Sequence, residues 1–570
     1  MKQNWIFAPT NPQRVKEIAV TRRLPRVIAA VLANRNFSGP DAIDRFFNPS
    51  LDNLYDPFLM TDLRKAVDRL EQAMMNKEKV MICGDYDVDG TTATSLLFLS
   101  LREIGLTTSY YIPDRDKEGY GLSKHGIDYA IQEGASLIIT CDCGINANSE
   151  IEYANQNHVD VIVTDHHEPG ETLPPAAAIL NPKRKDDSYP FKDLCGAGVA
   201  FKLLQGFLLA NNLPIDDIYK HLDLVAIGTA ADIVAILDEN RTLVAKGLEV
   251  LNASQKIGVQ ALLKVSGFEN KTLNVVNIVF GLAPRINAAG RLGEATRAVR
   301  LLTSFNLEES NLLSAELEQE NKNRQNIERE TINSAILQLN ATHDIDTDKV
   351  LVLSDTTWHH GVIGIVASKL KETYNRPVVM IAFQNGFGRG SARSIHGFDL
   401  YAAFSQCADL LDNYGGHKMA AGLTISEKNL PAFISRLKAI ASKSITDEML
   451  FPGIYIDTEI RFDEINQEVL DYLNKMSPYG PGNMRPVFVA RGLQIHGMPR
   501  IVGEQHLKFK ASKDRTVFSA IGWKMGEFYE MLISNRSLDM AFVIEENEWN
   551  GNKEIQLSIK DIRYSESTHH

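Results

Sequence analysis

The chain contains the stretch VMICGDYDVDG at residues 80–90. Its first four residues form a short apolar run, which is typical of a strand buried on both faces of a parallel sheet. Asp85, Asp87 and Asp89 follow this run at once, flanked by Gly84 and Gly90. We therefore expect a buried strand whose carboxyl end carries a cluster of carboxylates.

Two further apolar runs end in a similar way. The run at 137–141 leads into Cys141-Asp142-Cys143-Gly144, and the run at 161–164 leads into Asp165-His166-His167. Helix-like segments separate the runs, which favours a parallel sheet with right-handed crossovers. Ligands of open parallel sheets bind outside the carboxyl ends of the strands. These groups, and Asp232 in the later segment Gly228-Thr229-Ala230-Ala231-Asp232, are therefore expected to converge on one edge of the sheet.

So many carboxylates in one place require cations between them. At an effective dielectric constant near 20, two like charges about 4 Å apart repel each other by about 4 kcal/mol. Mixed carboxylate and imidazole ligands suit Mn²⁺, Mg²⁺ or Zn²⁺, and paired ions about 3.5–4 Å apart are a standard device for phosphoester hydrolysis. A single aspartate after a strand is more often a helix cap. Residues 85–90 also resemble the start of an EF-hand calcium loop, but the later ligands of such a loop are missing, so a calcium site of this type is excluded. The joint pattern predicts a two-metal phosphoesterase centre.

The composition limits the class of protein. The net charge of −12 argues by itself against nucleic-acid binding, but residues 349–445 hold 11 Lys and Arg against 6 Asp and Glu, which favours a local basic surface. The five cysteines are scattered, and no second pair accompanies Cys141 and Cys143 at zinc-finger spacing, so we expect reduced thiols and a cytoplasmic protein. No stretch approaches the roughly 20 apolar residues of a membrane span, and the N-terminus does not read as a signal peptide.

The pattern of apolar runs changes along the chain. Residues 306–340 contain neither Gly nor Pro and show only a sparse apolar stripe, which indicates a mostly solvated helix bridging two domains. After about residue 450, alternating strands with few helices favour a small β-barrel such as the OB fold. The predicted parts are a helical N-terminal segment at 1–75, a parallel-sheet α/β domain at 76–305, a connecting helix at 306–345, a second α/β domain at 346–447 and an OB-like β-barrel at 448–565.

The ordered motifs resemble those of RecJ-like members of the DHH phosphoesterase superfamily. The acidic segments described above are similar to the four phosphoesterase motifs of that superfamily, and residues 415–422 (GGHKMAAG) resemble the Gly-Gly-His signature of its DHH-associated domain. Further RecJ-like patterns stand at residues 284–291, 360–367, 390–394 and 478–483. The resemblance covers about residues 45–560, and it implies a DHH domain at 76–305 and a DHH-associated domain at 346–447.

The resemblance implies a 5′-to-3′ exonuclease that degrades single-stranded DNA in repair and recombination, with two Mn²⁺ or Mg²⁺ ions. Carried over position by position, the implied metal ligands are Asp87, Asp89, Asp142, His166 and Asp232, with Asp85 close by as a sixth ligand or as a phosphate contact. Asp142 would bridge the ions, and His167 would be a catalytic residue close to them, as a further ligand or as a phosphate contact. Superfamily members often carry a ligand histidine where this chain has Cys83, and we do not assign Cys83 as a ligand.

Seven residues are predicted to bind the substrate: Arg115, Arg285, Ser391, Arg393, Gly415, Gly416 and His417. By resemblance, the first four would hold the 5′-terminal phosphate and the next nucleotides. The two glycines permit close approach of the backbone to a phosphate, and His417 supplies a donor. The structural alternatives are a plain glycine-rich turn and a solvated, arginine-bearing loop. Bases could stack on Tyr110, Tyr111 and Tyr120, although aromatic residues near strands more often fill a core.

Two other functions compete with a polymer nuclease. One is hydrolysis of short oligonucleotides or cyclic dinucleotides by a related phosphodiesterase; the other is a catalytically silent scaffold that binds single strands. The barrel-like region after residue 450 favours the polymer nuclease, with Phe509 and Trp523 as base-stacking or core residues. The intact motif aspartates and histidines favour an enzyme. The expected partners are single-stranded DNA, a single-strand-binding protein and a helicase, for a monomer that does not associate with membranes.

Overall fold

The structure is a computed structural model that describes residues 3–37, 39–115, 117–503, 505–549 and 551–565. The chain forms two compact units. One unit is Leu51–Leu450, and the other combines Met1–Ser50 with Phe451–His570. Among the described residues, no helix has both the length and the apolar character that crossing a membrane requires.

The first α/β domain is built on a five-stranded sheet with the strand order β3-β2-β4-β5-β6. Neighbouring strands pair in parallel throughout, so the predicted parallel sheet is confirmed. The strands are β2 (Lys79–Gly84), β3 (Thr107–Tyr111), β4 (Ala135–Cys141), β5 (Asp160–Thr164) and β6 (Ala178–Leu180). Both faces of the sheet are covered, which explains why its strands read as continuous apolar runs.

Two hydrophobic cores lie on the two faces of this sheet. Val80 and Ile82 of β2 belong to the larger core, whereas Met81 and Cys83 belong to the smaller one, because successive side chains of a strand point to opposite faces. The larger core contains residues of α4 (Leu63–Met75), α5 (Val88–Glu103), α8 (Gly196–Ala210), α10 (Leu222–Ala231), α11 (Asp238–Asn252), α12 (Ile257–Val265), α14 (Ala283–Leu292) and α15 (Thr296–Thr303). The smaller core contains residues of α6 (Lys124–Gln132) and α7 (Asn148–Gln156). Two short helices, α9 (Asp216–Tyr219) and α13 (Val275–Asn277), complete the domain.

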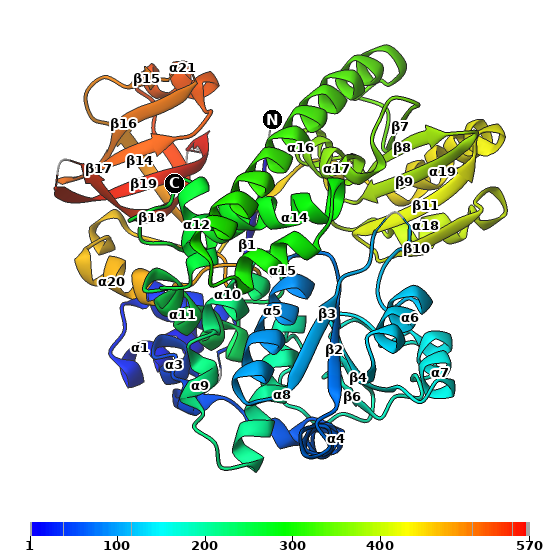
Figure 1. The fold of residues 1–570 in the computed structure, drawn as a ribbon. Helices are drawn as coiled ribbons and strands as arrows, with labels where there is room; N and C mark the ends of the chain where they lie inside the picture. Colours follow the sequence, from blue (N-terminus) through cyan, green and yellow to red (C-terminus); the bar gives the residue numbers. More distant parts are fainter. Residues whose placement is uncertain (1–2, 38, 116, 504, 550, 566–570) are drawn as a thin grey trace. The chain divides into compact units, whose positions relative to one another are not determined.

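A long helix, α16 (Leu307–Thr342), connects the two α/β domains, as predicted (Figure 1). Its buried positions recur every three or four residues. Leu317 belongs to the larger core of the first domain, and Leu339 belongs to a core of the second. Polar residues also stand on the buried face, among them Arg324 and Glu328, which pair at 2.8 Å. The helix is therefore less solvated than its sparse apolar stripe indicated.

The second α/β domain has a five-stranded sheet with the order β10-β11-β9-β8-β7. β7 and β8 pair in parallel, and the remaining pairs are antiparallel. Residues of α16 and α17 pack on one face, and residues of α18 and α19 pack on the other. The elements are β7 (Leu351–Asp355), α17 (His360–Tyr374), β8 (Val378–Gln384), β9 (Phe387–Arg393), α18 (Leu400–Ser405), β10 (Asn413–Gly416), β11 (Ala420–Ser426) and α19 (Leu430–Ser444).

The other unit joins the two ends of the chain. β1 (Asn4–Phe7) pairs in parallel with β12 (Gly453–Ile456), and Val27 and Phe46 share one core with Phe488. A seven-stranded sheet has the order β13-β14-β18-β19-β17-β16-β15, and β14 also pairs with β16. The other elements are α1 (Pro12–Arg22), α2 (Arg26–Asn34), α3 (Pro40–Phe47), β13 (Thr458–Glu459), α20 (Gln467–Lys475), β14 (Phe488–Ile495), β15 (Arg500–Val502), β16 (His506–Lys513), β17 (Thr516–Gly522), α21 (Tyr529–Ile533), β18 (Leu538–Trp549) and β19 (Asn552–Tyr564).

The structure divides the N-terminal region differently from the sequence prediction. The sequence grouped residues 1–75 into one helical segment. In the structure, Leu63 and Val67 of α4 lie in the larger core of the first α/β domain, whereas residues 1–50 belong to the unit that contains the C-terminal sheet. An apolar helix face shows in the sequence, but the element that covers it does not.

Candidate metal centre and anion pocket

The predicted acidic groups meet at the carboxyl edge of the parallel sheet. β2, β4 and β5 are neighbours, and Asp85, Asp142 and Asp165 each follow the last residue of one of these strands. Asp142 has a φ angle of 60°, a left-handed conformation that is uncommon for residues other than glycine. Such strain persists only where the surrounding structure imposes it, and it concentrates at functional sites.

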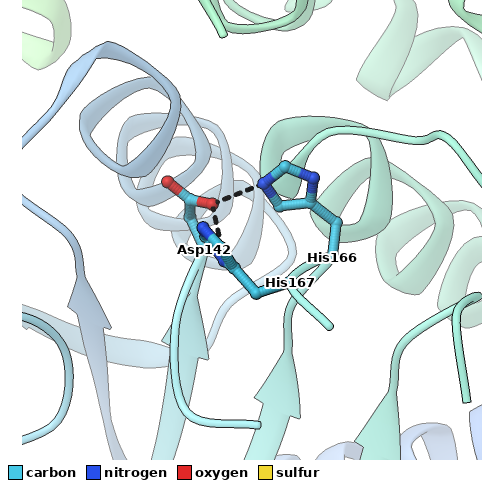
Figure 2. Close-up of side chains that lie close together, drawn as sticks. All are labelled: Asp142, His166 and His167. Carbon is cyan, nitrogen blue, oxygen red and sulfur yellow. Dashed lines mark ion pairs between the residues drawn. The ribbon is translucent and has the colours of Figure 1, made fainter. Parts of the chain in front are cut away.

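His166 lies within the acidic cluster. Its Nε2 atom is 3.0 Å from Oδ1 of Asp142, 3.5 Å from Oδ2 of Asp232 and 3.9 Å from Oδ2 of Asp89. The Nδ1 atom of His167 is 3.8 Å from the same Oδ1 of Asp142, and Figure 2 shows both imidazoles beside this one carboxylate. Asp142 thus has the central place that a bridging ligand needs.

Three overlapping groups of side chains could each hold a metal ion. They are Asp85-Asp87-Asp142, Asp89-His166-Asp232 and Asp142-His166-His167, with ligand atoms that lie within 4.8 Å of one another in each group. Asp142 and His166 each belong to two groups. The structure therefore brings together all six predicted metal ligands and His167, which come from four separate segments of the chain.

Several polar atoms of this cluster make no hydrogen bond, which fits a site for cations. Among the described residues, the buried side-chain atoms without a hydrogen-bond partner include Oδ1 of Asp85, Oδ1 of Asp142, Oδ2 of Asp232 and both ring nitrogens of His166. Buried polar atoms are nearly always satisfied, and exceptions call for an explanation such as an ion. Divalent metal ions accept carboxylate oxygens and neutral imidazole nitrogens as ligands, so this donor set matches the chemistry of such ions.

Burial and mutual repulsion raise the pKa values of the clustered carboxyl groups. Burial and the charge of Asp87 raise the pKa of Asp85 to about 8. Burial and the charge of Asp89 raise the pKa of Asp232 to about 9. For Asp142, burial and the neighbouring aspartates raise the pKa well above its usual range. A bound divalent cation opposes these effects because it stabilises the charged form.

Two of the aspartates also have the structural roles that the sequence left open. Asp87 caps α5 by accepting a hydrogen bond from the N–H of Gly90 at 3.0 Å. Asp89 accepts hydrogen bonds from the N–H groups of Gly196 at 2.5 Å and Ala197 at 2.9 Å. A carboxylate offers several lone pairs, so capping and metal ligation are compatible in one side chain, and the caps fix the orientation of these carboxylates.

Asp165 and Tyr120 hold His167, although sequence reasoning gave neither this role. Oδ1 of Asp165 is 2.8 Å from Nδ1 of His167, and the other oxygen accepts a hydrogen bond from the N–H of Ile145. Burial lowers the pKa of His167, but the hydrogen bond to Asp165 and nearby carboxylates outweigh burial and leave the pKa raised. Tyr120 donates a hydrogen bond to the carbonyl of Asp142 at 2.7 Å, and its hydroxyl is 3.0 Å from Nδ1 of His167.

Residues of both α/β domains line a cavity of about 540 Å³, and several of them are arginines. The first domain contributes Arg115 and Arg291, and the second contributes Ser391, Arg393 and Gly415. The guanidinium group of Arg115 also lies 5.4 Å from the ring centroid of Tyr86, which stands between two of the predicted metal ligands. Clustered guanidinium groups favour an anion such as phosphate.

Arg291 also lines the pocket, and the sequence did not single it out. It belongs to the RecJ-like pattern at 284–291, from which Arg285 was chosen instead. Its Nη1 donates a hydrogen bond to the carbonyl of Gly361 at 3.1 Å. Burial and the charges of Arg115 and other arginines lower its pKa to about 10. This repulsion between cations is relieved when an anion occupies the pocket.

Three of the predicted substrate-binding residues lie outside the lining of this cavity. Arg285 pairs through Nε with Glu318 of α16 at 2.6 Å and donates to the carbonyl of Gly281. Gly416 and His417 stand at the end of β10 and just after it. Ser391 and Arg393, for which a solvated loop was the structural alternative, belong instead to the regular strand β9.

Comparison with protein families matches three parts of the chain. The DHH family N-terminal domain matches residues 79–229. The DHHA1 domain matches residues 347–443, and the RecJ OB domain matches residues 456–561. These are the first α/β domain, the second α/β domain and the C-terminal sheet.

Several curated proteins are similar to nearly the whole chain. The single-stranded-DNA-specific exonuclease RecJ of Bacillus subtilis is 37% identical over 568 residues, which is 99% of this chain and 71% of the relative. The Escherichia coli protein of the same name is 33% identical over 95% of this chain and 96% of its own length. The crystal structure of RecJ from Thermus thermophilus in complex with Mn²⁺ has a TM-score of 0.85 and 31% identity, covering 99% of this chain and 80% of that one. A structure of the same protein with Mg²⁺ has a TM-score of 0.79. This chain belongs to the RecJ family of single-stranded-DNA-specific exonucleases.

Proposed function

We propose that this chain is a metal-dependent exonuclease that degrades single-stranded DNA from its 5′ end. The observation that carries the proposal is a buried cluster of unpaired carboxylate and imidazole atoms in the same unit as an arginine-lined pocket. Arg115 of the pocket lies against Tyr86, whose chain neighbours are Asp85 and Asp87. A terminal phosphate in the pocket would thus lie near the cluster, where the next phosphodiester can be cleaved. The repair and recombination role of the family agrees with this activity.

The positions of the side chains support a role for each of them. Asp85, Asp87, Asp89, Asp142, His166 and Asp232 would hold two Mn²⁺ or Mg²⁺ ions. Such ions, when bound, lower the pKa of a water molecule and stabilise charge on phosphoryl oxygens. His167, fixed by Asp165 and with its pKa raised, would donate a hydrogen bond to a phosphate oxygen. Arg115, Arg291 and Arg393 would hold the terminal phosphate.

A direct test of the activity uses single strands that carry a label at the 5′ end or at the 3′ end. In a time course with MnCl₂, the 5′-labelled strand should release a labelled mononucleotide at once, and the 3′-labelled strand should shorten stepwise. A duplex of the same sequence should resist. Release of a labelled mononucleotide first from the 3′ end would contradict the polarity, and cleavage of the duplex at the same rate would contradict the choice of single strands.

Divalent metal ions should stabilise the folded protein. Because the unpaired carboxylates repel one another without cations, binding of Mn²⁺ to the native state alone adds about 2.7 kcal/mol at a hundred times its Kd. We expect MnCl₂ to raise the Tm by at least about 3 °C and EDTA to reverse the effect, measured by differential scanning fluorimetry. An Asp89→Asn/Asp232→Asn double variant should lose most of this shift. An equal shift in that variant would place metal binding elsewhere.

The unit that holds the C-terminal sheet should contribute binding to long strands. Lys508 and Lys510 are exposed on β16 and alternate with buried residues such as Phe509, which is only 4% exposed and fills the core. Trp523 is 57% exposed and contacts the ring of His506. An exposed aromatic ring and a row of cations are the features with which OB folds hold single strands.

A fragment of residues 51–450 tests this contribution. It removes both ends of the chain, because Val27 and Phe46 share a core with the C-terminal sheet and would be uncovered by a C-terminal truncation alone. We expect a higher KM for long strands, lower processivity and a weaker salt dependence of binding, with a smaller loss on very short oligonucleotides. Circular dichroism would verify folding. Equal losses on short and long strands would contradict a strand-holding role.

We also propose that the enzyme acts as a monomer in the cytoplasm, with a single-strand-binding protein and a helicase as partners. The location is supported by the five cysteines, which are all free and buried, as expected in a reducing compartment. A helicase and a single-strand-binding protein would supply and cover the single strands that such an enzyme consumes. Size-exclusion chromatography with light scattering would test the monomer.

A further inference from the structure

One segment of the first α/β domain serves both the metal centre and the anion pocket. It connects β3 to α6 and carries Arg115 and Tyr120 within a few residues of each other. Arg115 lines the pocket, and the hydroxyl of Tyr120 donates a hydrogen bond to the carbonyl of Asp142 at 2.7 Å. The ring of Tyr120 also contacts the ring of His167, with centroids 5.5 Å apart. The two sites therefore share this connection.

The backbone around Tyr120 is shaped for this contact. Gly119 and Gly121 flank it with φ angles of 86° and 85°, which other residues rarely adopt. The hydrogen bond from Tyr120 goes to the carbonyl of Asp142, whose own backbone is left-handed. Tyr120 therefore supports the strained conformation that directs the Asp142 carboxylate into the cluster.

Glu118 ties the connection to its two ends. Its Oε1 accepts hydrogen bonds from the hydroxyl of Tyr111, the last residue of β3, at 2.7 Å, and from the N–H of Asp114 at 2.9 Å. Its Oε2 accepts a hydrogen bond from the hydroxyl of Ser123 at 2.5 Å, and Ser123 caps α6. One carboxylate thus joins the end of the strand, the residue before Arg115 and the start of the next helix.

We propose that Glu118 is a positioning residue that holds the connection in the conformation presenting Arg115 to the terminal phosphate and Tyr120 to the metal centre. Recognition of the 5′ end and the chemical step then depend on the same hydrogen-bonded carboxylate. This inference rests on the proposed function, because it assigns Arg115 to a phosphate and Asp142 to the metal ions. Glu118 touches neither the substrate nor the metal in this role.

The test compares variants of the full chain on single strands that differ only in a 5′-phosphate or 5′-hydroxyl end. Arg115→Ala should reduce the preference for the 5′-phosphate, and Tyr120→Phe should reduce kcat on both strands without changing the preference. Glu118→Ala should show both effects, each about five-fold or more, since it loses several hydrogen bonds. Glu118→Gln keeps an acceptor oxygen and should recover most of each loss. Glu133→Ala, which removes a surface pair with Lys79, is the matched control.

The ratio of the cleavage rates of the 5′-phosphate and 5′-hydroxyl strands separates positioning from a general loss of folded enzyme. A smaller fraction of active enzyme lowers both cleavage rates equally and leaves their ratio unchanged. If Glu118→Ala left the preference for the 5′-phosphate unchanged, the inference would be overturned. The same would follow if Glu118→Gln lost as much activity and preference as Glu118→Ala. An inactive wild type would overturn the proposed function as well. An active wild type with a clear 5′-phosphate preference that survives in Glu118→Ala would overturn the positioning role alone.

Discussion

Asp142→Asn should lower the turnover of single-stranded DNA by about 100-fold or more, a loss of about 2.7 kcal/mol of transition-state stabilisation. Asp142 belongs to two of the three candidate metal groups, and its Oδ1 lies close to both His166 and His167. Removal of its charge therefore weakens both metal positions at once. Affinity for single strands, measured by fluorescence anisotropy, should largely persist.

Asparagine is the better substitution at this position. Residue 142 has a φ angle of 60°, which asparagine tolerates more readily than alanine, so Asp142→Asn separates the charge from the backbone conformation. Asp128→Asn serves as control, because Asp128 accepts a hydrogen bond from Tyr153 away from the cluster. Turnover above about a tenth of the wild type, a loss below about 1.4 kcal/mol, would exclude Asp142 as the bridging ligand.

Arg393→Ala should impair cleavage of 5′-phosphorylated strands much more than cleavage of 5′-hydroxyl strands. The guanidinium of Arg393 donates to Ser391 at 3.1 Å and to the carbonyl of Ala392, which fixes it in the pocket while other N–H groups stay available. A charge-assisted contact to phosphate contributes about 1.5–3 kcal/mol, so the ratio of kcat/KM between the two strands should fall about 10- to 150-fold.

Arg285→Ala is the matched comparison for this prediction. The resemblance placed Arg285 beside Arg393 at the terminal phosphate, but its side chain pairs with Glu318 of α16. We expect Arg285→Ala to leave the 5′-phosphate preference unchanged and Arg291→Ala to reduce it. Equal losses on both strands in Arg393→Ala would show that Arg393 supports folding or general binding rather than the recognition of the strand end.

The cluster of acidic side chains could be predicted because its geometry follows from local rules. Asp85, Asp142 and Asp165 each directly follow a strand, and parallel neighbours place their carboxyl ends at one edge. The nature of the strands was visible in their continuous apolar runs. The repulsion between the clustered charges then required cations, whatever the details of packing.

The supports of the cluster and the lining of the pocket depend on contacts between distant segments. Tyr120 contacts Asp142 because Glu118 holds the connection between β3 and α6 in place. The position of Tyr120 in the sequence does not indicate that contact. In the pattern at 284–291, Arg285 and Arg291 are both plausible phosphate ligands. The packing of α14 against α16 turns the first toward Glu318 and leaves the second in the pocket.

The unit formed by the two ends of the chain shows most clearly that sequence patterns do not reveal contacts between distant segments. Periodicity in the sequence indicates the helices of residues 1–50 and the strands after residue 450, because each residue's face follows from its local geometry. It does not indicate that β1 pairs with β12 or that Val27 lies in the core of the C-terminal sheet. The free energy of apolar burial is non-directional and depends on the buried area. An apolar face can therefore be covered by any element of complementary shape, and only the tertiary structure shows which element covers it.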